Sequence, residues 1–179
     1  MKTSKGVEQH RIYMDHAATS PIDREVVDAM FPYLTERFGS ASSVHSFGAQ
    51  AQAAMDEARA KLASLIGATG EEIVFTSGGT ESDNIAIKRA TFKRRECLAK
   101  KGPHIITSAI EHAAVLESCR FLERMGYSVK YLPVDKHGLV NEAEMEDAIS
   151  AGTVLITIMH ANNEIGTIES IGEIAGPMT

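Results

Sequence analysis

The stretch HIITSAIEHAAVLESCRFLERMGYSVKYLPV (104–134) sets the expected fold. Its β-branched start at 104–108 is typical of a short strand, and residues 127–134 are again extended in character. Residues 111–126 between them show helical spacing of Val115, Cys119, Leu122 and Met125. Gly126 is placed to end this helix. A strand, a helix and a second strand in this order predict a unit of a parallel sheet.

The same alternation extends in both directions from this unit. Upstream, the spacing of apolar residues predicts a helix that ends at Gly67, then a strand at 72–76 and a helix from 81 to 100. Downstream, residues 153–160 are the most apolar segment, and we expect them at the centre of the sheet. The chain is therefore expected to be an α/β protein with a mostly parallel sheet and flanking helices.

Three further helices are indicated by their ends. Asn141 and Ser170 each precede a glutamate by three residues, which is the spacing of a capping box and predicts a helix start. Near the N-terminus, REVVDAMFPYLTERFG (24–39) carries a helical apolar stripe that contains Pro32. Proline is expected either to kink this helix or to mark its start.

Composition excludes several classes of protein. The 179 residues suit one domain or a large piece of a bigger one, and the net charge of −6 argues against a nucleic-acid partner. Because there is neither an apolar run of about 18 residues nor a signal-peptide core, we expect a cytoplasmic protein that does not cross a membrane. The histidines lack metal-ligand spacing, so no metal site is expected, and Cys97 and Cys119 are expected to be free thiols.

A glycine joint, SGGT (77–80), connects the strand expected at 72–76 to the following helix. The unpaired N–H groups and the positive dipole end of a helix start bind anions, and Gly78 and Gly79 allow close approach to the backbone. An ordinary turn with Thr80 as the N-cap is the alternative. The chain contains no GxxxxGK[ST] and no GxGxxG, which excludes the common nucleotide fingerprints.

Two more polar groups follow strand ends. His112 comes after the 104–108 strand, and Asn162 and Asn163 come after the 153–160 strand. A phosphate cradle, an imidazole and a carboxamide at neighbouring strand ends suit a phosphorylated, planar cofactor. Each group also has a plainer interpretation, since histidine is common at helix starts and paired asparagines are common in turns.

Five motifs in order are YMDHAATSP (13–21), SSVHSFG (42–48), VFTSGGTESDN (74–84), ITSAIEHAAVL (106–116) and MHANNEIGTI (159–168). Together they closely resemble the NifS/IscS-type cysteine desulfurases, which belong to the class V aminotransferase group of fold-type I pyridoxal-phosphate (PLP) enzymes. The resemblance extends from about Ile12 to the end of the chain. It implies a dimeric α/β enzyme that binds PLP and transfers sulfur from L-cysteine to an enzyme persulfide, leaving alanine.

The resemblance also implies roles for individual residues. Gly79 and Thr80 would contact the cofactor phosphate, and Asn163 would bond the phenolic oxygen or ring substituents. His112 would stack on the pyridine ring and serve as a catalytic residue in proton transfer. Residues 15–19 match the family motif near the substrate entrance. One departure is Ser40-Ala41, where the family commonly has asparagine-proline.

The resemblance further implies that the chain is the N-terminal half of such an enzyme. Residues 1–20 would be an N-terminal segment, and 21–179 the first part of the PLP-binding large domain. The family's Schiff-base lysine, pyridine-binding aspartate and persulfide cysteine would lie beyond residue 179, in a truncated or split protein. The 179 residues alone are therefore expected to be inactive and to need a second copy or a complementing C-terminal half.

Alternatives to this function remain open at the level of sequence. The family's sulfur serves iron–sulfur cluster and thiocofactor synthesis, so a scaffold or sulfur-acceptor protein is an expected partner. A selenocysteine lyase or a related class V carbon–sulfur lyase would share the motifs quoted above. A non-catalytic fragment or interaction module would keep the anion cradle without the lysine.

Overall fold

The computed structural model describes residues 11–95 and 102–175 of the chain. The chain divides into two compact units, residues 1–75 and 76–179, which are treated separately below. The sequence instead predicts a division by function, into a segment at 1–20 and a cofactor-binding domain at 21–179. This functional division stays a prediction. Cys97 lies outside the described residues.

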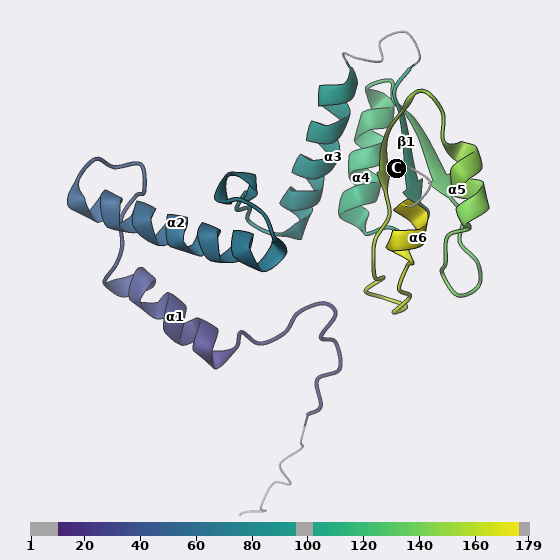
Figure 1. Cartoon of the computed structure of the whole chain (residues 1–179). Coiled ribbons are helices and arrows are strands. Elements are labelled where there is room, and N and C mark those ends of the chain that lie inside the picture. The colour runs from purple at the N-terminus through teal and green to yellow at the C-terminus, as the bar shows by residue number, and fades with distance from the viewer. Residues whose placement is uncertain (1–10, 96–101, 176–179) are drawn as a thin grey trace, which may run out of the picture. The chain divides into compact units, whose positions relative to one another are not determined.

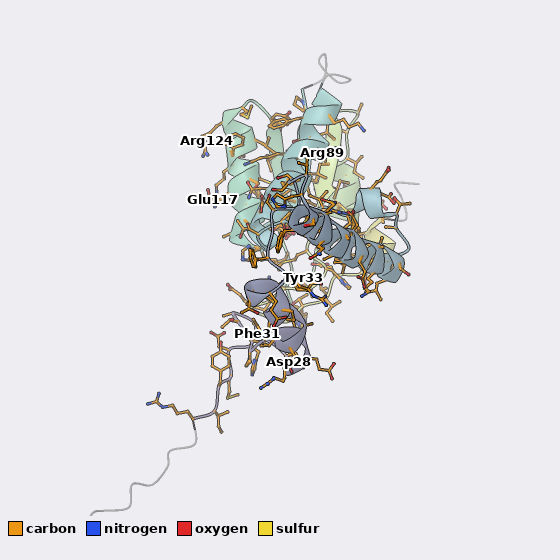
Figure 2. All side chains as sticks on the ribbon, turned by 90° about the vertical axis from the view of Figure 1, so that its left-hand side faces the viewer. Asp28, Phe31, Tyr33, Arg89, Glu117 and Arg124 are labelled. Atoms are coloured by element: carbon orange, nitrogen blue, oxygen red, sulfur yellow. The ribbon has the colours of Figure 1, made fainter. Side chains whose placement is uncertain are left out.

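The first unit contains helix α1 (Arg24–Thr35), helix α2 (Ser46–Ile66) and the 3₁₀ turn η1 (Gly70–Glu72). The Asp23 side chain accepts a hydrogen bond from the Glu25 N–H and so caps the start of α1. Pro32 lies inside α1, so the expectation that it marks the helix start is wrong, whereas a kink at Pro32 stays a prediction. Figure 2 shows Phe31 and Tyr33 projecting from α1.

Helix α2 ends where the sequence predicts. Gly67 has a φ of 68° and its N–H bonds the Ala63 carbonyl, the left-handed cap that glycine adopts without strain. The strand expected at 72–76 is not formed, because η1 occupies its start and residues 73–76 have no ladder partner among the described residues. The alternation of apolar side chains suggests an extended backbone there, but a strand also needs a neighbour to pair with.

The second unit is built on a three-stranded parallel sheet in the order β2-β1-β3. Strand β1 (His104–Ser108) pairs with β2 (Ser128–Leu132) on one side and with β3 (Thr153–Thr157) on the other. The expected strands at 104–108, 127–134 and 153–160 are thus confirmed as elements. Strand β3 lies at an edge of the described sheet, so its expected central place is wrong.

Four helices cover the two faces of this sheet (Figure 1). They are α3 (Gly79–Arg95), α4 (Ala113–Arg124), α5 (Glu142–Ala148) and α6 (Ile171–Ala175). The Asn141 side chain accepts hydrogen bonds from the Ala143 and Glu144 N–H groups, which confirms the expected start of α5. The α/β fold class expected from the sequence is confirmed.

The core lies in two layers, one on each face of the sheet. One layer joins α3 and α4 to the strands through Ile87, Ile105, Val115, Cys119, Leu122, Tyr127 and Val154. The other joins α5 and α6 to the sheet through Ile106, Leu132, Val140, Met145 and Ile174. Figure 2 shows Glu117 and Arg124 projecting outward from α4, on the side of the helix away from its buried residues Val115, Cys119 and Leu122. Cys119 is a buried free thiol, as expected, and burial raises its pKa to about 11.

The first prediction concerns this core. Replacing Leu122 (0% exposed) by alanine should lower the free energy of unfolding by about 2–5 kcal/mol, because it removes buried apolar surface and leaves a cavity. Replacing Leu139 (39% exposed) should cost less than about 1 kcal/mol. Urea unfolding followed by circular dichroism measures both, and equal losses would contradict the assigned core.

Candidate active site at the carboxyl end of the sheet

Several polar segments of the second unit meet at one end of its sheet. Figure 1 shows the carboxyl end of β1 and the start of α4 on the lower side of the view, where α3 also begins. In parallel α/β sheets, ligands bind at this end because loops and helix starts converge there. The segments 77–81, 108–112 and 159–163 supply the candidate residues.

The glycine joint opens directly into helix α3. The helix begins at Gly79, and its first backbone bond runs from the Ser82 N–H to the Gly78 carbonyl at 3.1 Å. The N–H groups before Ser82 have no carbonyl partner within the helix. A Cβ placed on Gly79 would meet no heavy atom within 4 Å beyond the helix itself among the described residues, so a ligand can approach the backbone. Thr80 is the second residue of the helix, so the expected alternative with Thr80 as N-cap is wrong.

Part of this helix start is already bound by a carboxylate. Oε2 of Glu81 accepts hydrogen bonds from the Ser77 N–H at 2.6 Å and the Ser77 hydroxyl at 2.8 Å. These bonds hold the pKa of Glu81 below its ordinary value. The donors of Ser77 are thus occupied, whereas the N–H groups of residues 78–81 have no carbonyl partner within the helix.

His112 is the N-cap of helix α4. Its Nδ1 accepts a hydrogen bond from the Ala114 N–H at 3.1 Å, so the ring lone pair is on Nδ1 and the proton of the neutral ring is on Nε2. The ring is exposed, which leaves its face and Nε2 available to a ligand. The plainer interpretation, a histidine at a helix start, therefore describes the same contact and does not compete with ligand binding.

Glu111, which the sequence did not single out, is a buried carboxyl group at the same end. Its Oε1 accepts hydrogen bonds from the Ser108 hydroxyl at 3.1 Å and from the Met159 N–H at 2.6 Å. Burial raises the pKa of Glu111, the two hydrogen bonds oppose this, and the nearby charges of Asp83 and Glu169 add to the rise.

The two asparagines after β3 differ in environment. Asn162 is buried, and its Oδ1 accepts hydrogen bonds from the Glu164 and Ile165 N–H groups at 2.8 and 3.0 Å. Asn163 is exposed at the same end of the sheet. The turn interpretation thus fits Asn162, while the side chain of Asn163 is open to solvent.

Residues 15–19 belong to the first unit, where they form a turn. The Tyr13 hydroxyl donates to the Asp15 carbonyl at 2.8 Å and to the Thr19 carbonyl at 3.1 Å. Ser40 and Ala41 lie in the same unit, between α1 and α2.

Two classes of feature are missing from the part of the chain that the structure describes. Within residues 11–95 and 102–175, no group of His, Cys, Asp or Glu is arranged to hold a metal ion. None of the helices formed by these residues has the length and apolar character needed to cross a bilayer.

The second prediction follows from the pKa of Glu111. The folded-state pKa is raised above the ordinary 4.5, so the contribution of Glu111 to the free energy of unfolding is fully present below this value and is lost as pH rises. The stability of the wild type minus that of Glu111→Gln should therefore fall as pH rises from 4.5 through the raised folded-state pKa. Urea unfolding across this range measures the difference.

The control for this experiment is Glu81→Gln. Because the pKa of Glu81 is lowered by its bonds to Ser77, its contribution to stability is present at high pH and is lost as pH falls. The corresponding difference should rise with pH. If the two stability differences changed with pH in the same direction, the environments assigned to Glu111 and Glu81 would be contradicted.

Comparison with known proteins indicates the family of the chain. The family model for aminotransferase class-V matches residues 12–177. The cysteine desulfurase IscS of Dictyoglomus turgidum is 53% identical over 167 residues, covering 93% of this chain and 41% of the relative. The cysteine desulfurase IscS of Methanosarcina thermophila is 54% identical, covering 93% of this chain and 40% of the relative.

Solved structures give the same result. A NifS-like protein matches with a TM-score of 0.85 and 39% identity, covering 92% of this chain and 44% of that protein. A structure of SspA in complex with cysteine matches with a TM-score of 0.83 and 42% identity, covering 91% of this chain and 46% of that protein. The chain thus spans about two fifths of the length of the curated relatives it matches. Because the family match extends over 12–177, the chain belongs to the aminotransferase class-V family.

Proposed function

We propose that this chain is the N-terminal part of a PLP-dependent cysteine desulfurase. The observation that carries the proposal is the meeting, at one end of a parallel sheet, of an open helix start at Gly79, an exposed imidazole at His112 and an exposed carboxamide at Asn163. Relatives named cysteine desulfurase and a related structure solved with cysteine support L-cysteine as the substrate.

These residues fit PLP in both charge and shape. The N–H groups of Gly79 and Thr80, with the Thr80 hydroxyl, would bind the phosphate, and the open space at Gly79 admits it. The face of His112 would pack on the pyridine ring, and the Asn163 amide would donate to the ring oxygen. When bound, PLP supplies an electron sink that weakens the bonds of a bound amino acid.

The role of His112 in catalysis would follow from its cap. With Nδ1 bound to the Ala114 N–H, the proton that can be exchanged is the one on Nε2. His112 would therefore donate and accept protons at Nε2, on the edge of the ring away from the cap. The helix holds the ring in place throughout, so little reorganisation accompanies proton transfer.

The remaining parts of the active site would come from other polypeptide. Strand β3 is at the edge of the described sheet, and its outer backbone groups are available for pairing with a further strand. We propose that a complementing segment or a second copy of the chain completes the sheet and the site. A scaffold or sulfur-acceptor protein for iron–sulfur cluster assembly is a further proposed partner, and a cytoplasmic location stays a prediction.

The third prediction tests the phosphate cradle. Gly79→Val should abolish PLP binding, because the side chain would fill the space at the helix start. Thr80→Ala should weaken binding about tenfold or more through loss of one charge-assisted hydrogen bond. Spectroscopic titration of the chain with PLP, with inorganic phosphate as competitor, measures both effects. Gly172→Val is the matched control, since Gly172 is also a helical glycine with open space. Equal effects at Gly79 and Gly172 would refute the cradle.

The fourth prediction tests the activity. With a dithiol added to reduce the persulfide, sulfide release from L-cysteine should require PLP and a segment corresponding to the three fifths of the relatives that this chain does not span. In that complex, His112→Ala should lower the rate about 100-fold or more, as expected for loss of a general acid–base group. His104→Ala should leave the rate unchanged, because His104 lies at the opposite end of β1 and its ring contacts Thr153.

Three outcomes would count against this assignment. Equal losses at His112 and His104 would mean that the functional end of the sheet is the other one. Sulfide release by the 179 residues alone would contradict the need for a complementing segment. Turnover of selenocysteine without turnover of cysteine would favour a selenocysteine lyase.

A further inference from the structure

The two candidate ligand-binding residues His112 and Asn163 share an arrangement. Each is exposed and each directly follows a buried polar residue, Glu111 (7% exposed) before His112 and Asn162 (8% exposed) before Asn163. Burying a polar side chain is costly unless its hydrogen bonds are made. The hydrogen bonds of Glu111 and Asn162 therefore indicate the structural role of these two buried side chains.

Each of the two side chains bonds the backbone of the other segment. Glu111, after β1, accepts a hydrogen bond from the Met159 N–H, after β3, at 2.6 Å. Asn162, after β3, donates from Nδ2 to the carbonyl of Ile110, after β1, at 3.1 Å. In both bonds the donor belongs to the segment after β3 and the acceptor to the segment after β1, but the side chain comes from the β1 segment in one bond and from the β3 segment in the other.

These bonds begin where the strand ladder stops. The last paired residues of β1 and β3 are Thr107 and Thr157, so no ladder bond aligns the segments that follow. Ser108 holds Glu111 from the side of β1, and the turn bonds of Asn162 to the Glu164 and Ile165 N–H groups hold it from the side of β3. Both side chains are therefore fixed at their own end before they reach across.

We infer that Glu111 and Asn162 form a reciprocal clamp that extends the alignment of β1 and β3 beyond their ladder and positions His112 and Asn163. Both are positioning residues, since they act through their neighbours. The alignment of the segments rests on this geometry alone, and only the step from alignment to PLP binding rests on the proposed function.

The clamp is tested first without any ligand. In the isotopically labelled 179-residue chain, Glu111→Ala should raise the hydrogen-exchange rate of the Met159 amide about tenfold or more, because that amide loses its acceptor. Nuclear Overhauser contacts between residues 110–112 and 159–163 should weaken in Glu111→Ala and in Asn162→Ala. Glu111→Gln keeps an acceptor oxygen and should retain both the protection and the contacts. Unchanged protection and contacts in Glu111→Ala would overturn the clamp.

The fifth prediction measures the consequence for PLP. Glu111→Ala and Asn162→Ala should each raise the Kd for PLP about tenfold. The double variant should raise the Kd by less than the product of the two single effects, because both bonds align the same pair of segments. Glu111→Gln should restore most of the affinity. Asn141→Ala removes the same kind of two-bond asparagine cap from α5 and should leave Kd unchanged.

The outcomes separate the clamp from the proposed function. The positioning role would be overturned if Asn141→Ala raised the Kd for PLP as much as Glu111→Ala and Asn162→Ala do. It would also be overturned if the effect of the double variant equalled the product of the two single effects. General destabilisation would then explain the losses of affinity. A wild-type chain that binds no PLP would count against the proposed cradle, and the exchange and contact measurements would still decide the clamp.

Discussion

The structure of the second unit depends on the burial of β1 between two parallel neighbours. Ile105 and Ile106 are completely buried on opposite faces of the sheet, so this strand anchors both layers of the core. Parallel pairing on both sides brings the carboxyl ends of three strands to one edge. Helix starts must then cluster at that edge, which concentrates unpaired N–H groups there.

A surplus of N–H donors explains how this edge tolerates several carboxylates. Glu81 binds Ser77, and Glu111 binds Met159, so each negative charge is matched to specific donors. At the start of α3, the N–H groups of residues 78–81 have no carbonyl partner within the helix. An anion bound at this helix start would therefore contact donors that the carboxylate of Glu81 leaves open.

Local patterns predicted what local interactions determine. The spacing of Val115, Cys119 and Leu122 identified α4, and Asn141 identified the start of α5, because both signals lie within a few residues of the structure they form. The strand expected at 72–76 and the central place expected for 153–160 failed, because pairing partners and strand order are set by distant residues. Gly79, Thr80, His112 and Asn163 lie in the second unit at the expected end. The sequence did not indicate Glu111, and it indicated Asn162 only by its place after a strand, because the bonds of both residues cross 48 and 52 residues of sequence.

The cap on α4 restricts which amino acids position 112 can accept. Asparagine, aspartate, serine and threonine all cap helices well, but none has an aromatic face. Phenylalanine and tryptophan offer that face but have no acceptor for the Ala114 N–H, and the acceptor of tyrosine is at the far end of its ring, too distant to cap the helix. Histidine alone among the common residues combines a flat ring with an acceptor atom at the distance that a cap requires. If the ring packs on a ligand as proposed, the helix cap and the ligand contact both require histidine at position 112. Every substitution there would then lose the cap, the ring contact or both.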